Sequence, residues 1–89
     1  MKFRATYIQD QDRIVFESNS KRPVDISQEV VGDSGSIRYL KYADTDSDEV
    51  QAFIFTTLEG KYIAAFDEND PIGIFSSYEK AVETILEKL

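Results

Sequence analysis

The strongest constraint on the fold is a pair of apolar segments separated by a short turn. Residues 50–58 read VQAFIFTTL and residues 61–66 read KYIAAF, with Glu59-Gly60 between them. Both segments are rich in the β-branched and aromatic residues that favour strands, and a Glu-Gly pair suits a tight connection. We therefore expect the two segments to pair as an antiparallel hairpin.

Both faces of this hairpin are apolar, because side chains alternate between the two sides of a strand. A two-residue turn places one apolar set on the first face, namely Phe53, Phe55, Tyr62, Ala64 and Phe66. The second face then carries Ala52, Ile54, Leu58, Ile63 and Ala65. A three-residue turn shifts the pairing by one residue but keeps Phe53 and Phe55 on the side opposite Ile54. A strand that is apolar on both sides belongs in a sheet that is covered on both faces.

The remaining sequence predicts further strands around this hairpin. Residues 2–8 and 13–18 have strand character and are joined by a polar turn, so we expect an N-terminal hairpin. Residues 37–43 read IRYLKYA and predict another strand, and residues 72–75 predict an edge strand that begins after Pro71.

Residues 19–36 have the weakest pattern. Asp25 followed by Gln28 is a capping signal, and Gly32 is placed to end a helix, so a short helix over residues 26–31 is one interpretation of this segment.

The C-terminus predicts a helix. Ser76-Ser77-Tyr78-Glu79 has the spacing of a capping box. The apolar residues that follow recur at helical spacing and form one stripe: Tyr78, Ala81, Val82, Ile85, Leu86 and Leu89. A length of 89 residues fits a single domain. We predict one α+β domain over residues 1–89, an antiparallel five- to six-stranded sheet of hairpins with the C-terminal helix packed on one face.

One helix is too small to cover such a sheet on both faces, since a twelve-residue helix is about 18 Å long. The second face needs another cover, for which residues 19–35, strong curvature of the sheet, a second copy of the chain and a protein partner are the candidates. The predicted interface residues are Phe53, Phe55, Tyr62 and Phe66.

The charge of the chain excludes some partners. Ten basic and seventeen acidic side chains give a formal net charge of -7, with eight acidic and two basic residues between positions 24 and 60. Nucleic acids and anionic membranes repel such a chain, so we expect no direct nucleic-acid or membrane partner.

The most acidic segment is a loop whose carboxylates are Asp44, Asp46, Asp48 and Glu49. It has the alternation of a calcium loop but lacks the Gly and the bidentate Glu of that pattern, so we predict no metal site. The same carboxylates, with Asp67, Glu68 and Asp70 in a second loop, support a different hypothesis in which the protein mimics nucleic-acid charge.

Catalytic chemistry has little support. The chain has no His, Cys or Trp. The tetrapeptide Gly32-Asp33-Ser34-Gly35 matches the nucleophile motif of chymotrypsin-like proteases, but that mechanism needs a histidine base. We therefore predict no catalytic residues and no cofactor.

These observations favour a small acidic, non-catalytic protein-interaction or regulatory module that forms a homodimer or binds a protein partner of unknown identity. The alternative is an inhibitor of phage or mobile-element type, which mimics a nucleic acid and occupies a DNA- or RNA-binding protein. Residues 1–7 alternate polar and apolar positions and have the pattern of neither a signal peptide nor a membrane span, so we expect a cytoplasmic protein.

Overall fold

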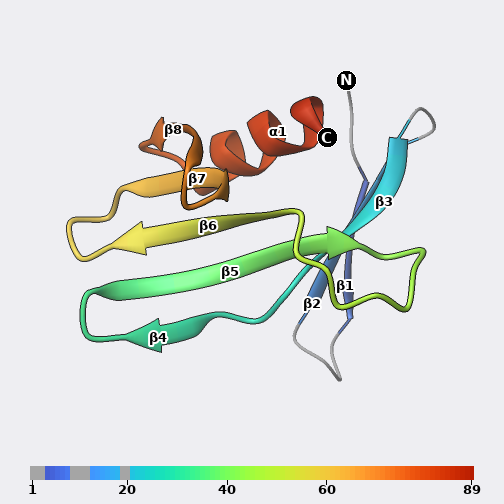
Figure 1. The fold of residues 1–89 in the computed structure, drawn as a ribbon, viewed down its shortest axis with the longest axis horizontal. Coiled ribbons are helices and arrows are strands. Elements are labelled where there is room, and N and C mark those ends of the chain that lie inside the picture. Colours follow the sequence, from blue (N-terminus) through green and yellow to red (C-terminus); the bar gives the residue numbers. More distant parts are fainter. Residues whose placement is uncertain (1–3, 9–12, 19–20) are drawn as a thin grey trace.

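In the part of the chain that the structure describes, eight strands form one antiparallel sheet, and a single helix packs against it (Figure 1). The computed structural model describes residues 4–8, 13–18 and 21–89. In chain order the elements are β1 (Arg4–Ile8), β2 (Arg13–Ser18), β3 (Lys21–Ile26), β4 (Val30–Gly32), β5 (Gly35–Tyr42), β6 (Ala52–Thr57), β7 (Tyr62–Asp67), β8 (Asp70–Phe75) and α1 (Tyr78–Lys88). The predicted α+β class, with an antiparallel sheet and a C-terminal helix on one face, is confirmed.

The sheet follows the order β1-β2-β3-β5-β6-β7-β8, and β4 pairs with β5 outside this path. One edge of β5 serves two strands, since β3 pairs with residues 40–42 and β4 with residues 35–37. The predicted N-terminal hairpin is confirmed by the pairing of β1 with β2, while its turn lies outside the described residues. The edge position predicted for residues 72–75 is also confirmed, because β8 ends the sheet.

The short helix predicted over residues 26–31 is wrong, and the sheet gains two strands in its place. Val24 and Ile26 of β3 are buried, and Val30 lies opposite Ile37 of β5. β-branched residues suit a pleated sheet better than a short helix, and β5 offers these strands a partner for their backbone groups. This extension explains why eight strands form where five or six were predicted.

The tetrapeptide at residues 32–35 is the turn between β4 and β5, with Gly32 paired to Gly35. Gly35 has a φ of 147°, and a Cβ added there would lie 2.2 Å from the Thr56 carbonyl oxygen. A glycine is therefore required at this position, where the β5 backbone lies close to Thr56 of β6.

The central hairpin of β6 and β7 forms with a three-residue connection rather than the two-residue turn. The Thr57 amide donates to the Lys61 carbonyl at 2.9 Å, and Gly60 adopts a φ of 85° between them. Phe53 lies opposite Ala65 and Phe55 lies opposite Ile63. The side chains of β7 therefore occupy the opposite faces from those that a two-residue turn assigns.

Helix α1 begins one residue later than the capping box indicates. Ser77 is the N-cap, and its side chain accepts a hydrogen bond from the Lys80 amide at 3.4 Å. Lys80 therefore stands three residues after the cap, at the position where a capping box has Glu or Gln, and the reciprocal half of that motif is not formed. The apolar stripe is confirmed, since Ala81, Val82, Ile85 and Leu86 are all buried.

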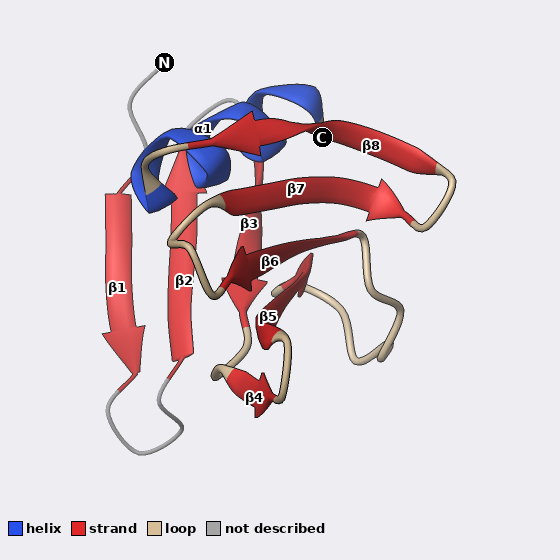
Figure 2. Cartoon of the chain, turned by 90° about the vertical axis from the view of Figure 1, so that its left-hand side faces the viewer, coloured by secondary structure: helices blue, strands red, loops and turns tan. Residues whose placement is uncertain are grey.

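The core lies between α1 and one face of the sheet. Helix α1 contacts β6, β7 and β8. The sheet bends, so that β1, β2 and β3 turn across the other strands and lie on the same side of them as the helix (Figures 1 and 2). The buried cluster combines the four helix residues with six from the sheet, namely Val24, Ile26, Leu40, Ala52, Ile54 and Ala64. Curvature and the helix thus cover the Ile54 face together.

Candidate functional site

The sheet face opposite the helix carries a continuous row of apolar side chains. The strand register places Val30, Ile37, Phe55, Ile63 and Ile74 directly opposite one another across β4, β5, β6, β7 and β8. Tyr39 and Phe53 form a second pair two residues along β5 and β6. We call these seven residues the open face: Val30, Ile37, Tyr39, Phe53, Phe55, Ile63 and Ile74.

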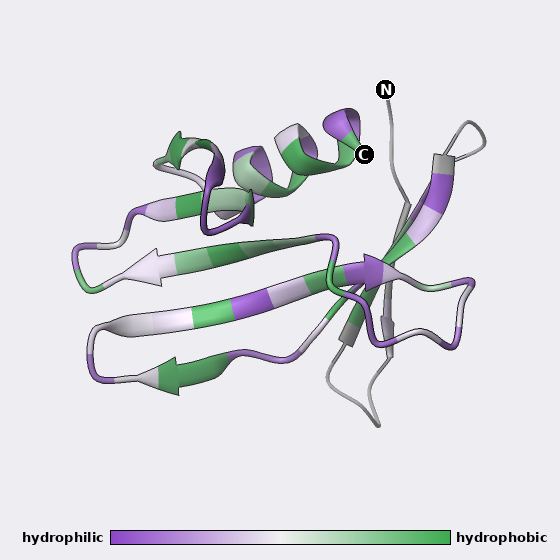
Figure 3. Ribbon diagram, viewed as in Figure 1, coloured by the Kyte–Doolittle hydropathy of each residue, from purple (hydrophilic) through white to green (hydrophobic). Residues whose placement is uncertain are grey.

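No helix or strand in the described part of the chain lies over the open face, because α1 and β1–β3 are all on the other side (Figures 1 and 2). Ile74 is 69% exposed, Val30 55% and Tyr39 39%, and the other four side chains are half-buried among their neighbours. Apolar residues recur along β4, β6 and β7 in this region (Figure 3). The open face therefore presents large apolar side chains to solvent.

The structure divides the predicted interface residues between the two faces. Phe53 and Phe55 lie on the open face. Tyr62 and Phe66 instead pack against the buried core, and the Tyr62 ring lies 5.9 Å from that of Tyr78. The three-residue connection causes this difference for both residues. It places Ile63 and Ala65 opposite Phe55 and Phe53, so Tyr62 and Phe66 lie on the other face.

Sequence reasoning missed five members of the open face. A two-residue turn between β6 and β7 assigns Ile63 to the Ile54 face, whereas the observed three-residue connection places it on the open face. Ile37 and Tyr39 alternate with polar Arg38 along β5, a signal that pointed to this face. Val30 and Ile74 gave no such signal, because their place in the row depends on which strands are neighbours.

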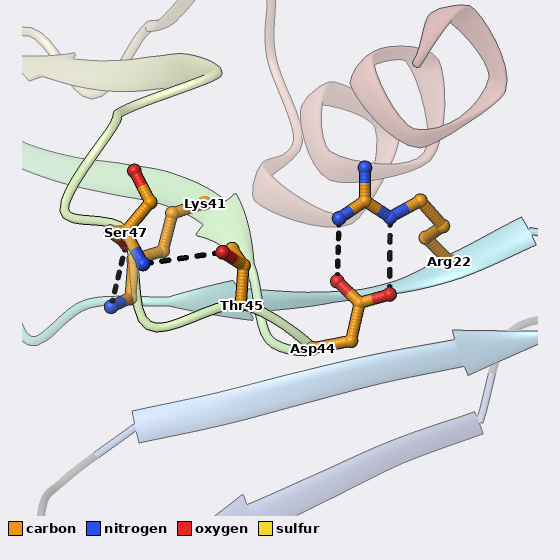
Figure 4. A network of polar contacts seen from close by, with 5 residues as sticks. All are labelled: Arg22, Lys41, Asp44, Thr45 and Ser47. Carbon is orange, nitrogen blue, oxygen red and sulfur yellow. Dashed lines mark hydrogen bonds and ion pairs between the residues drawn. The ribbon is translucent and has the colours of Figure 1, made fainter.

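The predicted acidic contact loop, residues 43–51, joins β5 to β6. Its first carboxylate is engaged within the chain. Asp44 accepts hydrogen bonds from Arg22 Nε at 3.1 Å and from Arg22 Nη2 at 2.7 Å (Figure 4). The Arg22 guanidinium also lies 3.8 Å from the centre of the Tyr42 ring. The Arg22 hydrogen bonds lower the pKa of Asp44 below its ordinary value. Asp44 is therefore a structural contact of the loop.

The other three predicted carboxylates, Asp46, Asp48 and Glu49, are exposed. Lys41 Nζ donates to the Ser47 carbonyl at 3.5 Å and ties the loop to β5 (Figure 4). Lys41 shares a face with Tyr39 by alternation along β5, so the loop borders the open face.

A second acidic turn lies at the same end of the sheet. The turn runs from the last residue of β7 to the first residue of β8, and these strand ends lie beside the start of β6 (Figure 2). We call the exposed carboxylates of both segments the acidic end: Asp46, Asp48, Glu49, Asp67, Glu68 and Asp70. Among the described residues no group of three or more His, Cys, Asp or Glu side chains is placed to hold a metal ion.

A polar cluster on the helix side of the sheet was not predicted. The Ser36 hydroxyl donates to the Glu29 carboxylate, and Arg38 Nη1 donates to the Ser27 carbonyl at 3.0 Å. Burial raises the pKa of the nearby Tyr78 phenol. These contacts join β5 to the segment between β3 and β4, which indicates a structural role for the cluster.

Comparisons with known proteins assign no family to this chain. No protein-family model, curated protein or solved structure matches it significantly. None of the helices in the described part of the chain is both long enough and apolar enough to cross a membrane.

The Arg22–Asp44 pair gives a titration prediction. Replacing Arg22→Gln removes the donor of both hydrogen bonds, so the pKa of Asp44 should rise toward the ordinary Asp value of about 3.9. In the wild type, the stability from this pair is present above that ordinary value and is lost as the pH falls through the lower folded-state pKa. NMR titration of the Asp44 carboxyl carbon measures the pKa, and denaturant unfolding at a series of pH values measures the change in stability.

Lys41→Gln is the matched control, because it removes a positive charge that contacts the loop at Ser47 rather than at Asp44. This variant should leave the pKa of Asp44 low. An identical Asp44 titration in the wild type and in the Arg22→Gln variant would contradict the assigned role of Arg22.

Proposed function

We propose that this chain is a non-catalytic protein-interaction module that docks through the open face. The observation that carries the proposal is the row of apolar side chains across five strands, which no described helix or strand covers. A cytoplasmic setting, expected from the sequence, forms part of the proposal.

Energetics support a docking role for this face. Burying a large apolar side chain contributes about 1.5–3 kcal/mol, so a row of such side chains in water forgoes a large stabilisation. Contiguous exposed apolar patches on soluble proteins commonly mark interaction sites. Along β5 the open face carries Ile37 followed by Tyr39, and along β6 it carries Phe53 followed by Phe55. No charged side chain interrupts this part of the face. Aromatic enrichment and depletion of charge are typical of interface cores.

The chemistry of the side chains supports a non-catalytic role. The chain has neither His nor Cys, the usual general base and the most reactive nucleophile. The carboxylates of the acidic end are exposed, whereas a catalytic acid is typically held in an apolar setting that raises its pKa.

A substitution at the edge of the open face tests the proposal. Ile74→Ser removes an apolar side chain that is 69% exposed, so its effect on the free energy of unfolding should stay within about 0.5 kcal/mol. Val31→Ser is the matched control. Val31 is 77% exposed and lies opposite Ser36, on the other face of the sheet.

Wild type and both variants serve as baits for affinity capture from the native cell, followed by titration of the purified partner. We expect the wild type and Val31→Ser to retain the same protein and Ile74→Ser to lose it. A second copy of this chain counts as a partner. Equal retention by all three baits, or no partner for the wild type, would contradict docking through the open face.

A second candidate function is inhibition of a nucleic-acid-binding protein by charge mimicry. One observation favours it, since two loops distant in sequence bring six exposed carboxylates to one end of the sheet. Such a charge density raises the rate and affinity of binding to a strongly basic groove. Asp44 contributes little to this surface, because Arg22 already neutralises it.

Charge mimicry predicts displacement of a DNA-binding protein from duplex DNA. Proteins from the native cell are loaded on a duplex-DNA column and challenged with the chain, which should elute a basic protein less efficiently as salt increases. Combined Asp46→Asn, Asp48→Asn and Glu49→Gln substitutions should abolish elution. Combined Glu79→Gln, Glu83→Gln and Glu87→Gln substitutions remove the same charge from α1 and should leave it intact. Equal elution by the two triple variants would exclude the acidic loop.

A further inference from the structure

We propose that the occupant of the open face is a second copy of this chain, docked face to face in a symmetric dimer. This inference rests on the proposed function and adds the identity and orientation of the partner. It depends on the size of the face, the chemistry of its centre and rim, and the form of the sheet edges.

The size of the face suits a dimer interface. Four strands spaced about 4.8 Å apart, with six residues of about 3.3 Å each, cover roughly 380 Å², and the three-residue β4 adds roughly 50 Å². The flat footprint is therefore about 430 Å², and the accessible area of a surface corrugated by side chains is larger. A standard interface buries about 800 Å² per partner, within reach of this face together with its rim.

The chemistry of the centre suits contact with itself. A symmetric two-fold interface brings the same patch of both copies together, so any charged group near the axis meets its own copy. The centre of the open face holds Ile37, Tyr39, Phe53, Phe55 and Ile63, none of which carries a charge at neutral pH. Two such sheets can pack about 10 Å apart, as in a β-sandwich.

The charges at the rim define the orientation. The acidic loop borders the open face at the end marked by Lys41. Lys61 lies at the other end, after the β6–β7 connection, where the two turns carry only two exposed carboxylates, Asp33 and Glu59, against six at the acidic end. A two-fold axis along the strands would set the two acidic ends side by side, with like charges facing each other. A two-fold axis across the strands sets each acidic loop against the Lys61 end of the other copy. The crosswise axis is therefore favoured.

Edge-to-edge pairing of two sheets is less suited to these strands. β8 forms one edge, and it contains Pro71 and a break in register with β7. β4 leaves an edge of only three residues, Val30–Gly32. Short edges, proline and bulges all impede strand addition. β1 forms the edge at the other end of the sheet order and has only five residues, Arg4–Ile8. The broad face offers more contact than any of these three edges.

Sedimentation velocity on the purified chain across a wide concentration series tests this dimer. The monomer has a mass of 10.2 kDa, and we expect a concentration-dependent species of twice that mass. Ile74→Ser should raise the dimer dissociation constant at least about tenfold, because the dimer loses two apolar contacts. Val31→Ser, on the other face, should leave the dissociation constant unchanged.

A charge-matched pair of variants tests the orientation. Lys61→Glu and Lys88→Glu change the net charge equally, but Lys88 lies on α1, away from the open face. We expect Lys61→Glu to weaken the dimer clearly more than Lys88→Glu does. Equal effects of these two variants would overturn the crosswise axis.

A species that stays monomeric at every concentration would overturn the dimer, and so would a dimer that Ile74→Ser leaves unchanged. The dimer can be overturned without overturning the proposed docking function. If the chain is monomeric but the wild-type bait retains another protein that the Ile74→Ser bait loses, docking through the open face stands and the second copy is excluded.

Discussion

The arrangement of the structure depends on a mismatch between its sheet and its helix. Side chains alternate between two faces that both need a cover, and the described residues form one helix, which packs on one of those faces. β6 and β7 carry apolar side chains on both faces, so each face of the sheet needs a cover. Helix α1 and the bent N-terminal strands supply it on one side, where Ile54, Leu40 and Ala64 are fully buried with the helix stripe. The other side carries the same kind of side chain with no cover from the described elements. The proposed docking role follows from this asymmetry.

The charged side chains are also distributed unevenly over the structure. The net charge is -7, and most of the described carboxylates lie in the turns and loops and on α1, while the middle of the open face has none. Arg22 bridges β3 to the acidic loop through Asp44, and Lys41 holds the same loop beside the open face through Ser47. The open face is therefore an apolar surface with an acidic border at one end. A face of this kind favours a partner that is apolar at its centre and less acidic where it meets the loop.

The sequence predicts the parts of this fold that depend on local pattern. The α+β class, the central hairpin, the edge position of β8 and the buried stripe of α1 each follow from periodicity or turn chemistry. The short helix predicted over residues 26–31 fails because β3 and β4 form by pairing with the distant β5, which no local signal reports. Tyr62 and Phe66 were placed on the wrong face because one extra residue in the β6–β7 connection reverses the register of the whole strand.

The candidate site also combines features that the local sequence pattern predicts with features that only the tertiary structure shows. Phe53 and Phe55 are recognisable from the apolar pattern on both faces, and the acidic loop from its composition. The row that makes the open face continuous needs the neighbour relations of β4, β5, β6, β7 and β8, so Val30 and Ile74 emerge only from the register. The Arg22–Asp44 pair joins residues far apart in sequence and is likewise a product of the tertiary fold.

The central claim is that one face of the sheet is covered within the chain and the other is covered from outside it. Methyl relaxation by a soluble nitroxide, measured by NMR at increasing protein concentration, tests this claim most directly. The account predicts that the methyl groups of Ile26, Ile54 and Ile85 stay protected throughout. Those of Ile63 and Ile74 should be relaxed in dilute solution and become protected as the chain associates. Protection of Ile63 and Ile74 in the dilute monomer would contradict it, because the chain would then cover both faces by itself.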